Sequence, residues 1–502
     1  MRATMVLDRE FTVGPVDPRL FGSLVEHLGR AVYGGLYEPG HPTADADGFR
    51  GDVLALTRDL GVTTVRYPGG NFVSGFDWED SVGPQADRPR RLELAWQSTE
   101  TNEVGLHEFM RWCARAGAQP MYAVNLGTRG IDAARAVVEY ANYPGGSVWA
   151  DRRIANGARE PFGIKLWCLG NEMDGPWQIG HRTALEYGRL ANESAKVMKW
   201  VDPTIEVVAC GSSYPEMPTF GDWELTMLDA CYENVDYVSL HRYYENKAGD
   251  TRRFLARSEE MGQLIHTVTS VCDAVGGKKH LRKRLNLSFD EWNVWFHSAH
   301  KDQEAWERDR WGRALPLLED VYTFEDALLV GGMLITLLKN ADRVKIACLA
   351  QLVNVIAPIC TRTGGGAWKQ TIYWPFQLAS RYGRGTALRA VVNAPVYDCD
   401  DLEAVPEVDA TATLEADGSV SLFALNRSLT EPAQLSCDLR GFAGLARMEH
   451  TVLHHADVHA VNTEAAPDVV RPMPGPGGTL ENGKLEVTLP PLSWSLIRVI
   501  KA

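Results

Sequence analysis

The chain has 502 residues, more than one hydrophobic core usually organises, so a large domain with a smaller one is expected. Hydrophobic residues make up 45% and charged residues 23%, which is typical of a globular protein and not of a disordered or fibrous one. The net charge of −14 argues against nucleic acid or another polyanion as a partner.

The chain shows no targeting or membrane signal. Its opening, MRATMVLDREF, has neither an apolar core nor a small-residue cleavage site, so no secretory signal is expected. The most apolar later stretch, Ala327 to Leu338, is too short to span a bilayer and is interpreted as a buried helix. The nine cysteines form no CxxC pair, which fits reduced thiols better than a disulfide framework. We therefore expect a cytoplasmic protein without a membrane partner.

Short β-rich runs alternate with helical patterns from about residue 16 to residue 385. Helical patterns include Asn102–Ala116, Asp132–Tyr140 and Thr183–Trp200. Most of the β-rich runs are almost continuously apolar, as in parallel strands buried on both faces. Eight such units predict the α/β class, as a (β/α)8 TIM barrel with elaborated loops. The alternative is an open doubly wound sheet, but no strand precedes GxGxxG or GxxxxGK[ST]. The predicted strands are Phe21–Glu26, Thr63–Tyr67, Pro120–Asn125, Ile164–Leu169, Glu206–Cys210, Tyr237–His241, Leu285–Asp290 and Lys345–Ala350.

The pattern changes after about residue 385. A Pro- and Asp-rich passage, Ala394 to Asp409, leads into the runs Thr411–Leu414 and Val420–Leu425, which flank the hairpin signal Asp417-Gly418. These runs predict a C-terminal antiparallel β-sandwich, jelly-roll-like in character. Further strands are predicted near Met448–Leu453, Leu485–Leu489 and Trp494–Val499.

The opening segment, Ala3–Val13, also reads as a strand and precedes the first barrel unit. We expect it to cross over and join the sandwich. The predicted organisation is therefore an N-terminal strand (residues 1–15), a catalytic barrel (residues 16–385) and a β-sandwich domain (residues 386–502).

Barrel enzymes place their catalytic groups at the carboxyl ends of the strands. In this chain those ends carry carboxylates, amides, an arginine and aromatic residues. Amides and carboxylates bond hydroxyl groups, and aromatic faces pack on the apolar face of a sugar ring. The strand ends therefore predict a carbohydrate site. The residues concerned include Glu26, His27, Arg66, Asn71, Asn125, Asn171, Glu172, His241, Arg242, Tyr243, Asp290, Glu291, Trp292, Asn293, Trp295 and Gln351.

Glu172 and Glu291 follow predicted strands four and seven, which face each other across the barrel mouth. Cleavage of a glycosidic bond with retained configuration needs one carboxyl group as acid and a second as nucleophile. Asn171 is placed to bond a sugar 2-hydroxyl. Arg66 is expected to keep Glu291 ionised, because a nearby cation favours the carboxylate. A less compensated setting is expected to raise the pKa of Glu172, so that it starts protonated.

Several of these residues also have structural interpretations. A histidine such as His241 is more often a bonded core residue than an acid or base, and Tyr243 is equally compatible with the core. Gln351 is compatible with a helix cap. Trp78 and Trp96 lie in a long loop after strand two, where either could bind ligand or anchor the loop.

Other catalytic chemistries find little support. The histidines His454, His455 and His459 lack a matching cysteine or carboxylate spacing and fall in the predicted sandwich, so a surface position is expected. The sequence contains no HExxH, and no GxSxG elbow follows a strand. A metal site and serine hydrolase chemistry are therefore not predicted.

At the same strand ends the sequence resembles the α-L-arabinofuranosidases of glycoside hydrolase family 51, over essentially the whole chain. The resemblance implies a retaining double displacement on terminal α-L-arabinofuranosyl groups of arabino- and arabinoxylo-oligosaccharides. It also implies no metal or organic cofactor, an intracellular location and a homohexamer. The motifs that carry it are FGSLVEHLGRAVYGGLYEPGHP, RYPGGNFVSG, NLGTRGIDAARAVVEY, WCLGNEMDGPWQIGH, VSLHRYY, LSFDEWNVW and RVKIACLAQLVNVIAPI.

The resemblance also implies individual roles. The family's acid/base falls on Glu172 of GNEMDGPW and its nucleophile on Glu291 of FDEWNVW. Trp96 resembles the loop tryptophan of the outer subsite, and Arg66 and His241 are expected to support the pair. The charged segment from His300 to Arg313 looks variable, so leaving-group preference is not transferred. The arabinose-binding positions fall on Glu26, Asn71, Asn171, Tyr243 and Gln351.

Two alternatives stay open. One is another retaining glycosidase on the same barrel, such as a β-xylosidase or an endoglucanase, against which the furanose-binding set Glu26, Asn71 and Gln351 argues. The other is a catalytically silent carbohydrate-binding protein, against which the two intact glutamate motifs argue. The sequence does not distinguish arabinan, arabinoxylan and arabinogalactan fragments as substrates.

Overall fold

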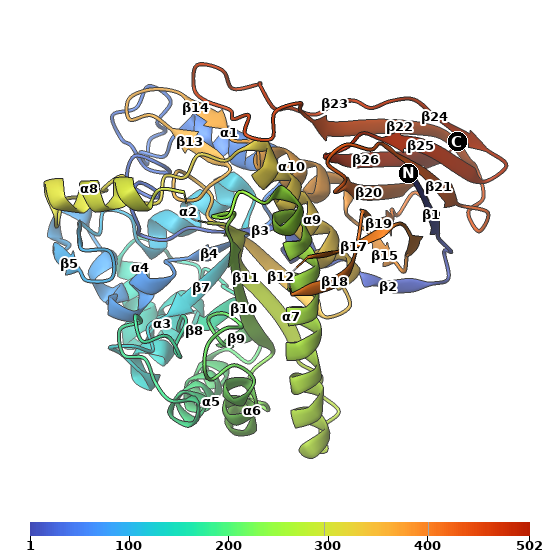
Figure 1. Ribbon diagram of the computed structural model, residues 1–502. Coiled ribbons are helices and arrows are strands. Elements are labelled where there is room, and N and C mark those ends of the chain that lie inside the picture. Colours follow the sequence, from blue (N-terminus) through green and yellow to red (C-terminus); the bar gives the residue numbers. More distant parts are fainter. Residues whose placement is uncertain (296, 400, 502) are drawn as a thin grey trace.

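The computed structural model describes residues 1–295, 297–399 and 401–501. Eight parallel strands close into a barrel, and antiparallel sheets of the C-terminal region lie to one side of it (Figure 1). Both N- and C-terminal segments lie in these sheets, in which the N-terminal strand Arg2–Val6 runs parallel to Ala433–Asp438 and the other pairs are antiparallel. The predicted fold class, an α/β barrel followed by antiparallel β-structure, is therefore confirmed.

The barrel strands agree closely with the predicted ones. Their hydrogen-bonded order is β10-β11-β12-β3-β4-β7-β8-β9, closed between β9 and β10. Most of their residues are buried, because side chains fill the barrel on one face and helices cover the other. The strands are β3 (Gly22–Leu24), β4 (Thr64–Tyr67), β7 (Gln119–Val124), β8 (Leu166–Leu169), β9 (Glu206–Cys210), β10 (Tyr237–Tyr244), β11 (Asn286–Val294) and β12 (Val344–Ala350).

Helices connect the strands and surround the barrel (Figure 1). Some predicted bounds shift. The helix predicted from Asn102 begins at Leu106, because the Glu108 carboxylate accepts the Gly105 N–H at 3.0 Å and fixes the start. The helices are α1 (Gly51–Leu60), α2 (Leu106–Ala116), α3 (Ile131–Asn142), α4 (Val148–Ala155), α5 (Ala184–Val201), α6 (Asp222–Cys231), α7 (Thr251–Lys278), α8 (Ala299–Asp309), α9 (Phe324–Lys339) and α10 (Tyr373–Tyr382).

Helix α9 is the apolar stretch interpreted as a buried helix, and every residue from Phe324 to Leu338 is buried. It lies between the barrel and the antiparallel sheets, so both of its faces are covered. A Cβ at Gly331 would meet the Trp494 ring at 2.3 Å, so glycine permits this close approach. Among the described residues, no helix combines the length and the apolar character that crossing a membrane requires.

The antiparallel sheets hold the second hydrophobic core. One sheet has the order β16-β1-β21-β25-β24 and the other β2-β15-β19-β20-β26-β22-β23. A separate hairpin of β17 (Val396–Cys399) and β18 (Leu402–Pro406) packs on α7. The strands of these two sheets are β1 (Arg2–Val6), β2 (Thr12–Pro15), β15 (Thr386–Leu388), β16 (Val391–Asn393), β19 (Val408–Leu414), β20 (Val420–Asn426), β21 (Ala433–Asp438), β22 (Leu445–His454), β23 (Met473–Pro474), β24 (Gly478–Glu481), β25 (Lys484–Leu489) and β26 (Ser493–Lys501).

The opening segment is two strands, not the single strand predicted over Ala3–Val13. β1 (Arg2–Val6) pairs with β16 and β21 in one sheet, and β2 (Thr12–Pro15) pairs with β15 in the other. Asp8 breaks the segment, because its carboxylate accepts the Glu10 N–H at 2.9 Å and its carbonyl accepts the Phe11 N–H at 3.2 Å. This local turn competes with a continuous strand.

Candidate active site

A cavity of about 720 Å³ opens at the carboxyl ends of the barrel strands. Three other predicted site residues, Arg66, Asn171 and His241, are buried beside it and contact its lining. The sequence-predicted residues are thus brought to one place from six barrel strands or their ends and, for Trp96, from the loop after β4. Those that line the cavity are Glu26, Asn71, Trp96, Glu172, Tyr243, Glu291 and Gln351.

The two glutamates reach the cavity from different backbone settings. Glu291 lies within β11, since this strand continues to Val294 and not only to the predicted end at Asp290. Glu172 follows β8 in a turn, with φ of +43° after Gly170 at +85°. Positive φ is uncommon for a residue with a side chain and marks a position held by its surroundings. Strands β9 and β10 separate β8 from β11.

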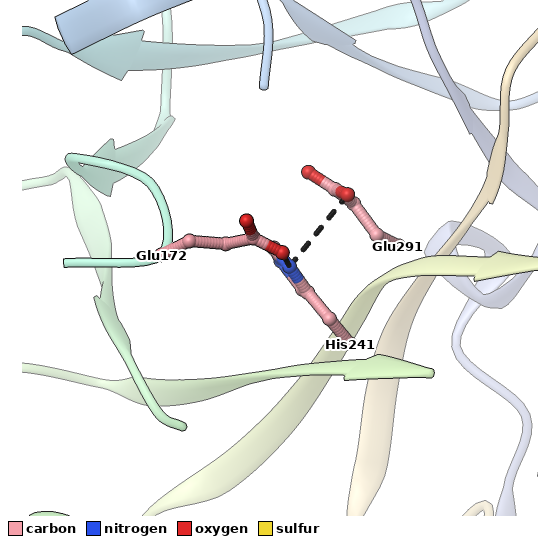
Figure 2. Close-up of side chains that lie close together, drawn as sticks. All are labelled: Glu172, His241 and Glu291. Carbon is pink, nitrogen blue, oxygen red and sulfur yellow. Dashed lines mark hydrogen bonds and ion pairs between the residues drawn. The ribbon is translucent and has the colours of Figure 1, made fainter. Parts of the chain in front are cut away.

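His241 joins the two glutamates (Figure 2). Its Nδ1 lies 3.0 Å from Glu172 Oε1 and 3.6 Å from Glu291 Oε2. Its Nε2 lies 3.2 Å from Asp290 Oδ1 on the same rim. Burial alone lowers the pKa of His241, but the charges of Glu291, Asp290 and Glu172 outweigh it and raise the pKa to about 10. His241 is therefore an imidazolium among three carboxyl groups, not only the bonded core histidine of the structural interpretation.

Glu172 and Glu291 have unequal partners. Burial raises the pKa of Glu172, an effect that its hydrogen bond to His241 opposes. Glu291 receives the Arg66 guanidinium at 2.7 Å on Oε1 and the Tyr243 hydroxyl at 2.8 Å on Oε2. Both oxygens of Glu291 are thus fixed by hydrogen-bond donors, one of which is a cation. One oxygen of each glutamate lies within 4.8 Å of the other.

Arg66 also organises the amides of the site. Its second nitrogen donates to Asn171 Oδ1 at 2.7 Å, and the Asn171 amide donates to Asn71 Oδ1 at 3.2 Å. The guanidinium is buried, and Asp290 lies 3.6 Å from its Nε. The planar Arg66 guanidinium therefore sets the positions of Glu291 and Asn171. Asn171 in turn positions Asn71.

Glu26 lies at another wall of the cavity. Its Oε1 accepts the Phe72 N–H and the Trp96 indole N–H, each at 2.9 Å. Gln351 bonds it twice, donating to Oε2 at 3.3 Å and accepting the Glu26 N–H at 3.1 Å. Gln351 thus contacts Glu26 in the cavity wall. Burial raises the pKa of Glu26 to about 8, although the Phe72 and Trp96 donors oppose the shift.

The two tryptophans of the loop after strand two, Trp78 and Trp96, have different roles in the structure. Trp78 is buried against Tyr140 and Trp149, so it anchors the loop. Trp96 lines the cavity beside Glu26.

Two aromatic residues at the cavity mouth received no role from the sequence. Trp177 donates its indole N–H to Glu172 Oε2 at 2.7 Å and stacks on Tyr214, with ring centroids 5.8 Å apart and planes 15° apart. Trp177 stands in the GNEMDGPW motif, so proximity to Glu172 was the available signal. Tyr214 follows β9 in a loop without a motif, and only the fold brings it to Trp177.

The cavity also bears on the question of a metal. Glu172, His241 and Glu291 each bring one potential ligand atom to within 4.8 Å of the others. The neighbouring carboxyl groups raise the pKa of His241 to about 10, which favours ion pairing within this group. The sandwich histidines His454 and His459 are exposed, and His455 is half-buried.

Glu26→Gln is expected to make stability less dependent on pH. Because the folded-state pKa of Glu26 is raised, the folded protein holds this proton more tightly than the unfolded chain. The stability that the proton contributes is complete below pH 4.5 and is lost as pH rises through about 8. The unfolding temperature should therefore fall less steeply across this interval in the variant. Thermal melts of both proteins at several pH values measure this, and parallel curves would contradict it.

A closed parallel barrel with two neighbouring carboxyl groups at the ends of its strands is the architecture of the barrel glycoside hydrolases. Comparison with known proteins specifies the family. Residues 56–260 match the α-L-arabinofuranosidase 1 domain, and residues 290–493 match the α-L-arabinofuranosidase C-terminal domain.

Relatives and solved structures extend over the whole chain. The intracellular exo-α-(1→5)-L-arabinofuranosidase of Halalkalibacterium halodurans is 56% identical, covering 100% of this chain and 99% of its own. The exo-α-(1→6)-L-arabinofuranosidase of Bifidobacterium longum is 48% identical, covering 99% and 97%. The structure of a family 51 α-L-arabinofuranosidase from B. longum matches with a TM-score of 0.95 at 46% identity, covering 99% of both chains. The protein therefore belongs to the α-L-arabinofuranosidases of glycoside hydrolase family 51.

Proposed function

We propose that the protein is a retaining, exo-acting α-L-arabinofuranosidase that releases terminal non-reducing α-L-arabinofuranosyl residues from arabino- and arabinoxylo-oligosaccharides. The observation that carries the proposal is the approach of Glu172 and Glu291, whose nearest oxygens lie within 4.8 Å. Retaining enzymes hold their carboxyl groups about 5–5.5 Å apart, whereas inverting enzymes leave about 6.5–9.5 Å for a water molecule. The relatives, which are named as α-L-arabinofuranosidases, indicate that the sugar is arabinofuranose.

In the first step Glu291 attacks the anomeric carbon while Glu172 protonates the departing oxygen, giving a covalent glycosyl-enzyme. Burial gives Glu172 the raised pKa that a general acid needs. In the second step Glu172 takes a proton from water, which attacks the anomeric carbon and releases arabinose and Glu291. His241 contacts both groups, so it stabilises the negative charge that moves from Glu291 to Glu172 during the first step.

The sugar is held by the polar groups around this pair. Asn171, beside Glu172, is placed to bond the 2-hydroxyl, an interaction that strengthens in the transition state of glycosidases. Glu26 and Gln351, bonded to each other, and Asn71, bonded to Asn171, supply the other polar groups for the ring. Tyr243 orients Glu291 and lines the same pocket. Trp96, adjoining Glu26, shapes the outer subsite.

Trp177 and Tyr214 form the aromatic platform for the leaving group. Their stacked rings stand at the cavity mouth on the side of Glu172, which protonates the leaving oxygen. The linkage at this position is not fixed by the family, since one relative is named for the (1→5) linkage and another for the (1→6) linkage.

The activity is tested by comparing an aryl α-L-arabinofuranoside with the aryl β-xyloside that carries the same leaving group. We expect a clear preference in kcat/KM for the arabinofuranoside. A preference for the xyloside would replace the assignment with a β-xylosidase. Tight sugar binding without turnover of either substrate would support a silent carbohydrate-binding protein instead.

Location, assembly and domain division are proposed on the same family basis. The relatives named intracellular support a cytoplasmic enzyme that acts on short imported oligosaccharides. The resemblance supports a homohexamer. The pairing of β1 and β2 with C-terminal strands supports a division into an N-terminal strand segment (1–15), a catalytic barrel (16–385) and a β-sandwich (386–502).

A further inference from the structure

Helix α8 (Ala299–Asp309) lies on the rim of the barrel beside the loop that carries β5 (Arg91–Glu93) (Figure 1). It supplies no residue to the lining of the catalytic cavity. Two of its side chains, Asp302 and Trp306, are one helical turn apart and so point to the same side of the helix. Each makes a hydrogen bond to the backbone of a cavity-lining residue, Asp302 to Leu318 and Trp306 to Trp96.

Asp302 fixes the cavity-lining residue Leu318. Its side chain is buried, and its Oδ1 accepts the Leu318 N–H at 2.8 Å. Leu318 has φ of +52°, and its carbonyl accepts the Ile356 N–H at 2.7 Å. Leu318 therefore connects Asp302 to Ile356. Ile356 has φ of +37°, which is unusual for a β-branched residue, and its carbonyl accepts the Gln351 N–H at 3.0 Å. A series of hydrogen bonds through Leu318 and Ile356 therefore connects α8 to Gln351.

Trp306 fixes the cavity-lining residue Trp96. Its indole N–H donates to the Trp96 carbonyl at 2.9 Å, and the Trp96 indole donates to Glu26. The chain just after α8 fixes the same loop, because the Trp311 N–H donates to the Gln97 carbonyl at 2.9 Å. A second path therefore leads from α8 to Glu26. Because Glu26 and Gln351 bond each other, the two paths end on one pair of side chains.

We propose that α8 is a clamp on the sugar pocket, in which Asp302 and Trp306 are positioning residues that set Gln351 and Glu26 at the spacing the sugar requires. The inference rests on the proposed function, because it assigns Glu26 and Gln351 to sugar binding. It also assigns a role to the charged segment after strand seven, which tunes substrate affinity without touching the substrate.

The first test is Trp306→Phe, which keeps an aromatic ring and removes the N–H donor. Loss of one net hydrogen bond corresponds to a change of about 2- to 10-fold. We expect KM for the aryl α-L-arabinofuranoside to rise by about that factor with kcat nearly unchanged, because sugar binding weakens equally in the ground and transition states. In a Trp96→Ala background the same substitution should have no further effect on KM, since the indole that it positions is gone.

The second test compares Asp302→Ala with Asp302→Asn. Asparagine keeps an oxygen that can accept the Leu318 N–H, so KM should stay near wild type. Alanine removes this acceptor, so KM should rise by about 2- to 10-fold, the effect of losing one hydrogen bond. Glu307→Ala, on the exposed side of α8, is the matched control and should leave KM unchanged.

The outcomes separate the two proposals. If the wild-type protein does not turn over the arabinofuranoside, the proposed function fails. If it does, but Trp306→Phe leaves KM unchanged, or raises it as much in the Trp96→Ala background, the clamp is wrong. A drop in unfolding temperature with an unchanged KM would assign Trp306 and Asp302 to stability alone and would also overturn the clamp.

Discussion

Replacing Glu172 by alanine is expected to lower kcat/KM by about 10²–10⁴-fold on arabinofuranosides with poor leaving groups. Such leaving oxygens depart only when protonated, and Glu172 is a cavity-lining carboxyl group with a raised pKa that lies within 4.8 Å of Glu291. The loss should be much smaller on an aryl glycoside whose leaving group departs as an anion. Steady-state rates on a matched pair of substrates measure the difference.

Azide provides the internal control for this variant. With the carboxylate gone, the small anion should enter the vacated space and attack the glycosyl-enzyme, which restores the rate of the second step without a base. The product would then be the arabinosyl azide with retained configuration. Equal losses on both classes of substrate, with no effect of azide, would remove Glu172 from the role of acid and base.

Glu291→Ala is expected to be almost inactive on every substrate, including the activated aryl glycosides. The nucleophile is needed whatever the leaving group, and the groups that prepare it, Arg66 and Tyr243, have no substitute carboxylate to act on. Asp290 cannot take over, because it is buried against His241 and Arg66. Activity on activated substrates and an unfolding temperature are measured together, so that loss of the nucleophile is distinguished from loss of the fold.

A leaving-group dependence in Glu291→Ala like that of Glu172→Ala would contradict the assignment. It would mean that the two glutamates share the protonation step and that neither is the nucleophile.

The barrel could be predicted because its strands are buried on both faces, which leaves an apolar run such as Glu206–Cys210 visible in the sequence. The opening segment could not, because the turn at Asp8 depends on one side chain that bonds its own backbone. Single motifs located Glu172 and Glu291, but not how they are connected. The position of His241 between them depends on the pairing of β10 with β11, which places His241 opposite Glu291.

Contacts that join distant segments were beyond the sequence for the same reason. Tyr214 meets Trp177 only because the loops after β8 and β9 meet at the rim. The bonds from α8 to Leu318 and Trp96 connect a charged, irregular segment to two loops, and no periodicity marks them. In each case the chemistry of the residue was visible and its partner was not.

The most direct test of the central claim is to trap the glycosyl-enzyme with a fluorinated arabinofuranosyl donor and to map the label by peptide mass spectrometry. Fluorine beside the anomeric carbon slows both steps, and a good leaving group lets the first proceed faster than the second. A mass increase of one fluoropentosyl unit on the peptide that carries Glu291 is the predicted result. Labelling of any other residue, or turnover with inverted configuration and no labelled peptide, would contradict it.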